Sequence, residues 1–132
     1  MNDSNIAPLR GRGKVYAVQE VLRRDDSSGQ LVPAYDITPA LEYGLLEFLM
    51  PGGRMMLSTA PVVASMRTKL KDFCDEDFIL PIGDPAAICA ASMIAASMNN
   101  GRVRVLRWDK FVQRYIPILV DINNGGVHGT AA

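Results

Sequence analysis

The sequence has few of the residues that bind metal ions or form disulfide bonds. It contains one histidine and two cysteines among 132 residues, and Cys74 and Cys89 do not form a CxxC pair. The histidine, His128, lies in a glycine-rich tail, where no neighbouring structure would fix its geometry for acid–base chemistry. We therefore expect free cysteines, with Cys89 buried as a small apolar side chain, and neither a metal nor a cofactor.

Excess charge and long apolar runs are also absent. Fourteen Lys and Arg residues balance fourteen Asp and Glu residues, so the formal net charge at pH 7 is zero. This balance excludes binding to nucleic acid or to a membrane through overall charge, although a local patch stays possible. No apolar run reaches the roughly 18 residues that a membrane span needs, and residues 1–13 lack the apolar core of a signal peptide. We expect a cytoplasmic protein without a membrane partner.

The residues that are present are typical of a globular protein. Hydrophobic residues make up 48% of the chain and charged residues 21%, which is the usual balance for a packed domain. Helix spacing and end signals occur at residues 58–73 and 85–99. Strand patterns cover residues 14–24, 31–37, 45–50, 102–108 and 115–122, with shorter candidates at 54–57 and 78–82.

The order of these elements predicts an α+β fold. Strands near both ends of the chain predict a mostly antiparallel sheet with two helices packed on one face, and the last two strands predict a C-terminal β-hairpin. We expect a flexible N-terminal arm over residues 1–13, a single domain over 14–122, and a disordered glycine-rich tail over 123–132.

The second helix is unusual because it has no charged residue after its N-cap, Asp84. A helix that is apolar all round is normally buried all round, yet one sheet and one other helix can cover only part of it. Two interpretations stay open: a half-buried helix with a bland outer face, or a self-association surface, with a homodimer as the default assembly. The residues predicted for self-association are Ile88, Ala91, Ser92, Met93, Ala95 and Ala96.

The C-terminal hairpin alternates cations with aromatic residues. Cations meet phosphates and aromatic rings stack on bases, which is what a surface for single-stranded nucleic acid requires. The residues of this hypothesis are Arg102, Arg104, Arg107, Trp108, Lys110, Arg114 and Tyr115. The other interpretation is an exposed strand face carrying arginines, with the two aromatic rings anchoring the edge of the core.

The densest carboxylate group follows the first helix and consists of Asp72, Asp75, Glu76 and Asp77. On a strand, Asp75 and Asp77 would share a face and could hold Mg²⁺. Consecutive acidic residues after a helix are more often a solvated connector or turn caps. Because no nucleophile has a base within reach in the sequence, we expect no catalytic residues and no enzyme activity.

Five stretches carry a resemblance to known proteins: KVYAVQE, YDITPALEYG, LPIGDPAA, GRVRVLRWD and RYIPI. Over roughly residues 14–122 the chain resembles a group of small uncharacterised proteins from tailed bacteriophages. The resemblance implies a phage product that acts inside a bacterial cell by binding a host or replication component, and it carries no activity to transfer. The predicted function is therefore protein–protein binding, to itself or to an unidentified protein partner. Nucleic-acid binding by residues 102–115 is the alternative, and a metal-dependent enzyme using residues 72–77 is a distant third.

Overall fold

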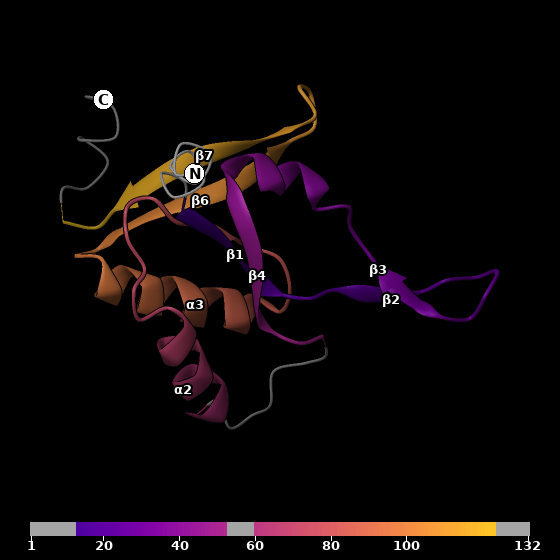
Figure 1. Cartoon of the computed structure of the whole chain (residues 1–132), viewed down its shortest axis with the longest axis horizontal. Coiled ribbons are helices and arrows are strands. Elements are labelled where there is room, and N and C mark those ends of the chain that lie inside the picture. Colours follow the sequence, from indigo (N-terminus) through magenta and orange to yellow (C-terminus); the bar gives the residue numbers. More distant parts are fainter. Residues whose placement is uncertain (1–12, 53–59, 124–132) are drawn as a thin grey trace, which may run out of the picture.

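The computed structural model describes residues 13–52 and 60–123 of the chain (Figure 1). Their elements, in chain order, are β1 (Gly13–Gln19), β2 (Leu22–Arg24), β3 (Leu31–Pro33), the 3-10 helix η1 (Thr38–Tyr43), β4 (Gly44–Met50), α2 (Ala60–Lys69), β5 (Phe78–Leu80), α3 (Pro85–Met98), β6 (Arg102–Asp109) and β7 (Arg114–Asp121). The strand expected at 54–57 and the start of the helix expected at 58 lie outside the described residues.

Five strands form the main sheet in the order β4-β1-β5-β6-β7. Strands β4, β1, β5 and β6 run parallel, and only β7 is antiparallel to its neighbour. The prediction of a mostly antiparallel sheet is therefore wrong, whereas the C-terminal hairpin of β6 and β7 is confirmed. The reason is the position of the helices: α2 and α3 each lie between two strands of this sheet, and such a crossover returns the chain in the same direction.

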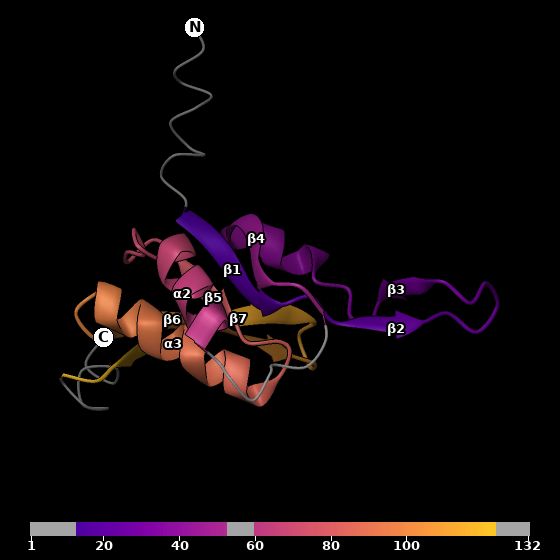
Figure 2. The same cartoon turned by 90° about the horizontal axis from the view of Figure 1, so that it is seen from below.

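The two faces of the sheet carry separate apolar clusters. Along β1, Val15 and Ala17 face one side while Tyr16 and Val18 face the other, as the alternation in the sequence predicts. The first side is covered by η1. The second side is covered by both α2 and α3 (Figures 1 and 2). The largest fully buried side chains are Leu49, Met66, Leu70, Ile79, Leu80, Leu106, Val15 and Val18.

Strands β2 and β3 form a separate two-stranded ribbon that projects from the body of the protein (Figures 1 and 2). The sequence pattern joined β1 and β2 into one strand, but the chain leaves the sheet after Gln19. The carboxylate of Asp25 accepts hydrogen bonds from the hydroxyls of Ser27 and Ser28 and stabilises the turn at the end of the ribbon. Pro33 lies in this ribbon, where a missing N–H is tolerated.

Both edges of the main sheet carry a feature that interrupts strand pairing. β7 forms one edge and contains Pro117, which has no N–H to donate. β4 forms the other edge, and the Nζ of Lys69 on α2 donates to the carbonyl oxygens of Phe48 and Leu49 at 3.2 and 3.3 Å.

Helix α3 begins and ends as its sequence predicts. Asp84 is the N-cap, and its carboxylate accepts a hydrogen bond from the N–H of Ala86 at 2.8 Å. Pro85 occupies the first turn, and Gly101, with a φ of +81°, follows the end of the helix. None of the helices in the described residues is long and apolar enough to cross a membrane.

Candidate functional site

A cavity of about 960 Å³ lies at the carboxyl ends of β5 and β6. We call it the carboxyl-edge cavity. Its walls are residues 34–36 after β3, residues 81–83 after β5, residues 106–108 of β6, and the side chains of Pro39, Leu80, Gln113 and Tyr115. Open α/β sheets bind ligands beyond the carboxyl ends of their parallel strands, beside the point where the strand order reverses. Here the order reverses at β1, because β4 pairs on one side of it and β5 on the other.

A second hollow of about 310 Å³ lies at that reversal, beyond the ends of β1 and β5. It shares Tyr35 and Gly83 with the carboxyl-edge cavity. The two hollows therefore adjoin, and Tyr35, which is 60% exposed, stands at their common border.

The loop after β5 is held in place by Gln19, the last residue of β1. The side-chain oxygen of Gln19 accepts a hydrogen bond from the N–H of Asp84 at 2.7 Å, and its side-chain nitrogen donates to the carbonyl of Pro51 at 3.2 Å. Gly83 has a φ of +115°, and a Cβ there would lie 2.4 Å from the Cβ of Gln19. Only glycine fits this position, so the cavity wall between β5 and α3 depends on it.

The aromatic wall of the cavity comes from the hairpin. Trp108 and Tyr115 are paired residues of β6 and β7, and their rings meet edge to face with centroids 5.0 Å apart and an interplanar angle of 69°. The hydroxyl of Tyr43 donates to the carbonyl of Tyr115 at 2.7 Å and fixes the backbone at this point. Tyr115 is buried, whereas Trp108 is 41% exposed and presents part of its indole to the cavity.

Asp36 contributes a negative charge at the cavity. Its carboxylate accepts a hydrogen bond from the N–H of Thr38 at 3.0 Å, and hydrogen bonds from the Thr38 side chain and backbone lower the pKa of Asp36. Burial, together with the Asp36 charge, raises the pKa of Tyr115. At neutral pH the walls of the cavity therefore include an ionised carboxylate and a protonated phenol.

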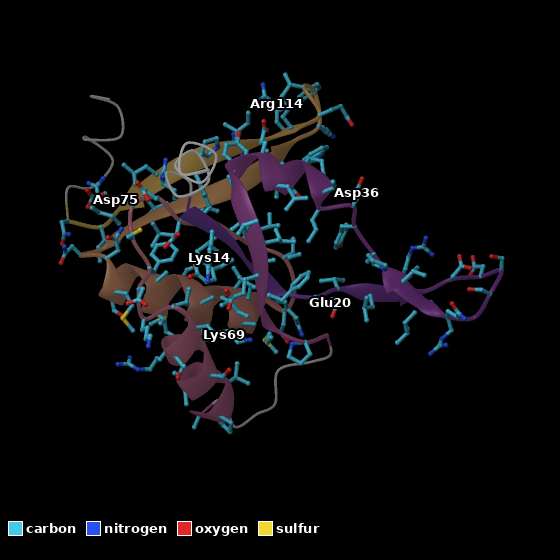
Figure 3. All side chains as sticks on the ribbon, in the orientation of Figure 1. Lys14, Glu20, Asp36, Lys69, Asp75 and Arg114 are labelled. Atoms are coloured by element: carbon cyan, nitrogen blue, oxygen red, sulfur yellow. The ribbon has the colours of Figure 1, made fainter. Side chains whose placement is uncertain are left out.

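The structure divides the seven hairpin residues predicted to bind nucleic acid into two groups. Arg107, Trp108 and Tyr115 line the carboxyl-edge cavity, close to the turn that contains Lys110. Arg102 and Arg104 lie at the other end of β6. Figure 3 shows Asp75, which contacts both of these arginines, and Arg114 at opposite ends of the hairpin.

Two of these cations, Arg102 and Arg104, form contacts within the protein at the end of the hairpin far from its turn. Arg102 pairs with Asp75 at 3.1 Å and with Asp121 at 3.3 Å. Arg104 donates to the backbone carbonyl of Asp75, and its guanidinium lies 4.3 Å from the ring centroid of Phe78.

The other cations of the hairpin lie near its turn. Arg114 pairs with Glu42 at 3.1 Å. Lys110 lies over the ring of Phe111, with its Nζ 5.9 Å from the centroid. Arg107 is exposed and forms no ion pair with residues 13–52 or 60–123. The cationic charge left available beside the cavity is therefore small.

The residues predicted for self-association do not all share one face. Ala91 and Ala95 are fully buried in the core of their own chain. Ile88 and Ala96 are partly buried against the same cluster, and the hydroxyl of Ser92 donates to the carbonyl of Ile88 at 2.8 Å. Met93 alone of the six is exposed, at 72%.

The side of α3 that faces away from the sheet is uncharged and exposed. It consists of Ala86, Cys89, Met93 and Ser97, which we call the α3 outer face. The expectation that Cys89 is buried is wrong, because the thiol lies on this face and α2 covers another part of the helix.

Two of the carboxylates at residues 72–77 accept hydrogen bonds from the protein itself, one from backbone groups and one from side chains. Asp77 accepts hydrogen bonds from the N–H groups of Lys14 at 2.8 Å and Cys74 at 2.9 Å. Asp75 accepts hydrogen bonds from the side chains of Asn99 at 2.9 Å and Arg102 at 3.1 Å, which lower its pKa. No group of three or more His, Cys, Asp or Glu side chains that could hold a metal occurs in the described part of the chain. His128 lies outside it.

The sequence reasoning missed Tyr35 and Asp36. Both were read as part of a strand, and nothing in their local pattern indicates that they meet a hairpin located far along the chain. A tyrosine followed by an aspartate is the only local signal. Their position follows from the fold: η1, which comes directly after them, packs on the face of the sheet that includes Tyr115 of β7.

The fold and its cavity define an open α/β protein with a hollow beyond the ends of its parallel strands. The model of the Phage Pam3 gp32-like protein family matches residues 13–122, and the chain belongs to this family. The resemblance to phage proteins is thereby confirmed. No curated protein and no solved structure matches the chain.

Proposed function

We propose that this phage-family protein acts by binding, and that the carboxyl-edge cavity binds a nucleotide unit, either free or at the end of a single-stranded nucleic acid. The observation that carries the proposal is the convergence of Trp108, Arg107 and Tyr35 on one cavity of about 960 Å³. An exposed indole offers a stacking surface for a base, and an exposed guanidinium can pair with a phosphate.

The small number of available cations favours a short ligand. A protein that follows a long nucleic-acid backbone neutralises many phosphates. Here the chain has zero formal net charge, and Arg102, Arg104 and Arg114 are engaged in contacts within the protein. One nucleotide, with its base in the cavity and its phosphate near Arg107, matches the charge at this site.

Trp108 makes the proposal directly testable, because it is the only tryptophan in the chain. The full-length protein would be titrated with four nucleoside monophosphates and with a single-stranded oligonucleotide of mixed sequence, in low and in high salt. We expect the emission of Trp108 to change on binding. A slope of log affinity against log salt near −1, rather than a steep one, would fit one phosphate contact.

Calorimetric titration of variants assigns the binding to the cavity. Trp108→Ala removes the stacking surface and lowers affinity by about tenfold or more. The matched control is Phe111→Ala, which removes a ring that is 88% exposed in the same hairpin but outside the cavity walls. An unchanged Trp108 spectrum and no heat with any of these ligands at low salt would overturn the proposal.

We also propose that the α3 outer face is a self-association surface. This candidate is supported by the absence of charge on Ala86, Cys89, Met93 and Ser97 and by the exposure of Met93 at the centre of the face. Small side chains allow two helices to approach closely, and a symmetric dimer would bring the two copies of Cys89 together.

Sedimentation velocity and thiol crosslinking test the second candidate. In a Cys74→Ser background, mild oxidation should yield a dimer linked through Cys89, and Met93→Glu should abolish both the dimer and the crosslink. Ser65→Glu introduces the same charge at an exposed position of α2 and serves as the control. A monomer at all concentrations, with no crosslinking, would exclude self-association through this face.

A further inference from the structure

One buried hydroxyl at the carboxyl-edge cavity has no partner within the described residues. Tyr115 is only 6% exposed and lines the cavity. Among these residues no sealed side-chain oxygen or nitrogen lacks a hydrogen bond. The phenol oxygen, for which the described residues supply no partner, is therefore open to the space that its ring lines. The hydroxyl can therefore donate a hydrogen bond to a ligand that fills the cavity.

Asp36 supplies the opposite kind of group at the same cavity. Its carboxylate is ionised at neutral pH and can only accept hydrogen bonds. Its Oδ1 accepts the N–H of Thr38, which fixes the orientation of the group and leaves further acceptor capacity. Asp36 and Tyr115 both line this cavity, and the Asp36 charge contributes to the raised pKa of Tyr115. A ring that enters the cavity thus finds both an acceptor and a donor in its walls.

Guanine has the base edge that complements this pair. Its N1–H and amino group are two adjacent donors, and its O6 is an acceptor beside them. Adenine and cytosine place a ring-nitrogen lone pair next to the amino group, which an ionised carboxylate repels. Uracil and thymine offer one donor between two carbonyl groups. Guanine alone can donate twice to a carboxylate while it accepts from a neighbouring hydroxyl.

We infer that the cavity selects guanine nucleotides, with the Asp36 carboxylate accepting from N1–H and the amino group and the Tyr115 hydroxyl donating to O6. This inference rests on the nucleotide binding proposed above. Trp108 then forms the stacking surface, and Arg107, which is exposed and also lines the cavity, is available to the phosphate.

The test is a calorimetric titration of the full-length chain with GMP, IMP, AMP and CMP. IMP keeps N1–H and O6 but lacks the amino group. We expect GMP to bind about tenfold or more tightly than AMP and CMP, with IMP between them. Oligonucleotides that end in guanine, compared with free GMP, show whether the base comes from a strand end or from a free nucleotide.

Two variants test whether the preference for guanine comes from the Asp36 carboxylate and the Tyr115 hydroxyl. Asp36→Asn can still accept the N–H of Thr38, so the loop is retained, and it should reduce the preference for GMP to about twofold while the affinity for AMP stays the same. Tyr115→Phe keeps the ring and removes only the hydroxyl, and it should weaken the binding of GMP. Asp26→Asn, on the ribbon and outside the cavity walls, makes the same change of charge as a control.

The outcomes separate this inference from the proposed function. Equal affinity for all four nucleotides, or a guanine preference that survives Asp36→Asn, would overturn the guanine assignment and leave nucleotide binding in place. A failure of every nucleotide to bind would overturn both.

Discussion

The side-chain oxygen of Gln19 accepts a hydrogen bond from the backbone N–H of Asp84 at 2.7 Å. This bond joins the carboxyl end of the central strand β1 to the N-cap of α3. The same amide donates to the carbonyl of Pro51 after β4, so a single buried side chain ties together the ends of three elements. It stands behind the loop that forms one wall of the carboxyl-edge cavity.

We predict that Gln19→Leu destabilises the protein by about 2 kcal/mol or more. Leucine has a similar volume, but it leaves the N–H of Asp84 and the carbonyl of Pro51 without their side-chain partner in a partly buried place. Urea denaturation of both proteins measures the difference. A loss below about 0.5 kcal/mol would mean that water replaces the amide at little cost.

Gly83→Ala should destabilise the protein more than Gly29→Ala. Both glycines have a positive φ, +115° and +75°, but a Cβ at Gly83 would collide with Gln19, whereas one at Gly29 meets nothing within 4 Å. The backbone conformation alone costs about 1 kcal/mol, and the collision adds to it only at Gly83. Thermal and urea denaturation of the pair should show this order. Equal losses would indicate that the loop at Gly83 moves away without strain.

Arg104→Ala should reduce the stability of the protein, whereas Arg107→Ala should reduce its affinity for nucleotides. Arg104 stacks on Phe78 and donates to a backbone carbonyl, so its loss should reduce stability by about 1 kcal/mol and leave nucleotide affinity unchanged. Arg107 is exposed and lines the cavity, so its loss should reduce affinity and leave stability unchanged. Calorimetric titration and denaturation of both variants check this. Loss of binding in Arg104→Ala at normal stability would move the binding surface to the other end of the hairpin.

Asp77→Ala should lower stability by about 2 to 3 kcal/mol, and this loss should not depend on metal ions. The carboxylate accepts the N–H groups of Lys14 and Cys74, which become unpaired in the variant. The melting temperature of the wild type should be the same with EDTA and with millimolar Mg²⁺. A rise with Mg²⁺ that Asp77→Ala abolishes would instead support a metal site among these carboxylates.

The stability of the protein should fall between pH 10 and pH 12 because of Tyr16. Burial, with further contributions from the charges of Asp77 and Glu47, raises the pKa of this phenol from 10.0 to about 12. In this range the unfolded chain loses the proton that the folded chain keeps, so unfolding releases a proton and becomes more favourable as pH rises. The contribution present below pH 10 and lost by pH 12 is about 2 to 3 kcal/mol.

Tyr16→Phe isolates this effect. It keeps the ring beside Phe73, whose centroid is 5.9 Å away, and removes the titrating group. Denaturation at a series of pH values should show a smaller loss of stability in the variant than in the wild type above pH 10. Parallel curves for the two proteins would show that Tyr16 keeps its ordinary pKa in the folded state.

Local signals in the sequence predicted the elements well. Asp84, Pro85 and Gly101 mark the ends of α3 by capping chemistry that acts within a few residues. The hairpin of β6 and β7 and the alternation along β1 follow equally from short-range patterns. These features depend on neighbours in the chain, which the sequence displays directly.

The pairing of strands was not predictable in the same way. β5 has only three residues, Phe78–Leu80, and its short apolar run carries no sign that it lies between β1 and β6. Unless β5 is known to lie between β1 and β6, the helices on either side of it cannot be recognised as crossovers. The parallel direction of the strands then cannot be predicted. Periodicity shows which face of a strand is buried but not which strand pairs with it.

The candidate site was half predictable. The hairpin pattern pointed to Trp108, Arg107 and Tyr115, whose chemistry is visible in the residue types. It could not show that Arg102 and Arg104 form hydrogen bonds with Asp75, because those contacts depend on how the segment after α2 packs against β6. Tyr35 and Asp36 reach the cavity only through the fold.

The two borders of the sheet restrict how copies of this chain can join. At β7 the proline interrupts the row of donors, and at β4 a lysine ammonium occupies two backbone oxygens. Growth of a continuous sheet from one molecule to the next is thereby discouraged at either side, as in proteins that resist fibril formation. Contacts between copies would then have to use side-chain surfaces, whose composition can be altered by mutation without disturbing the main-chain framework.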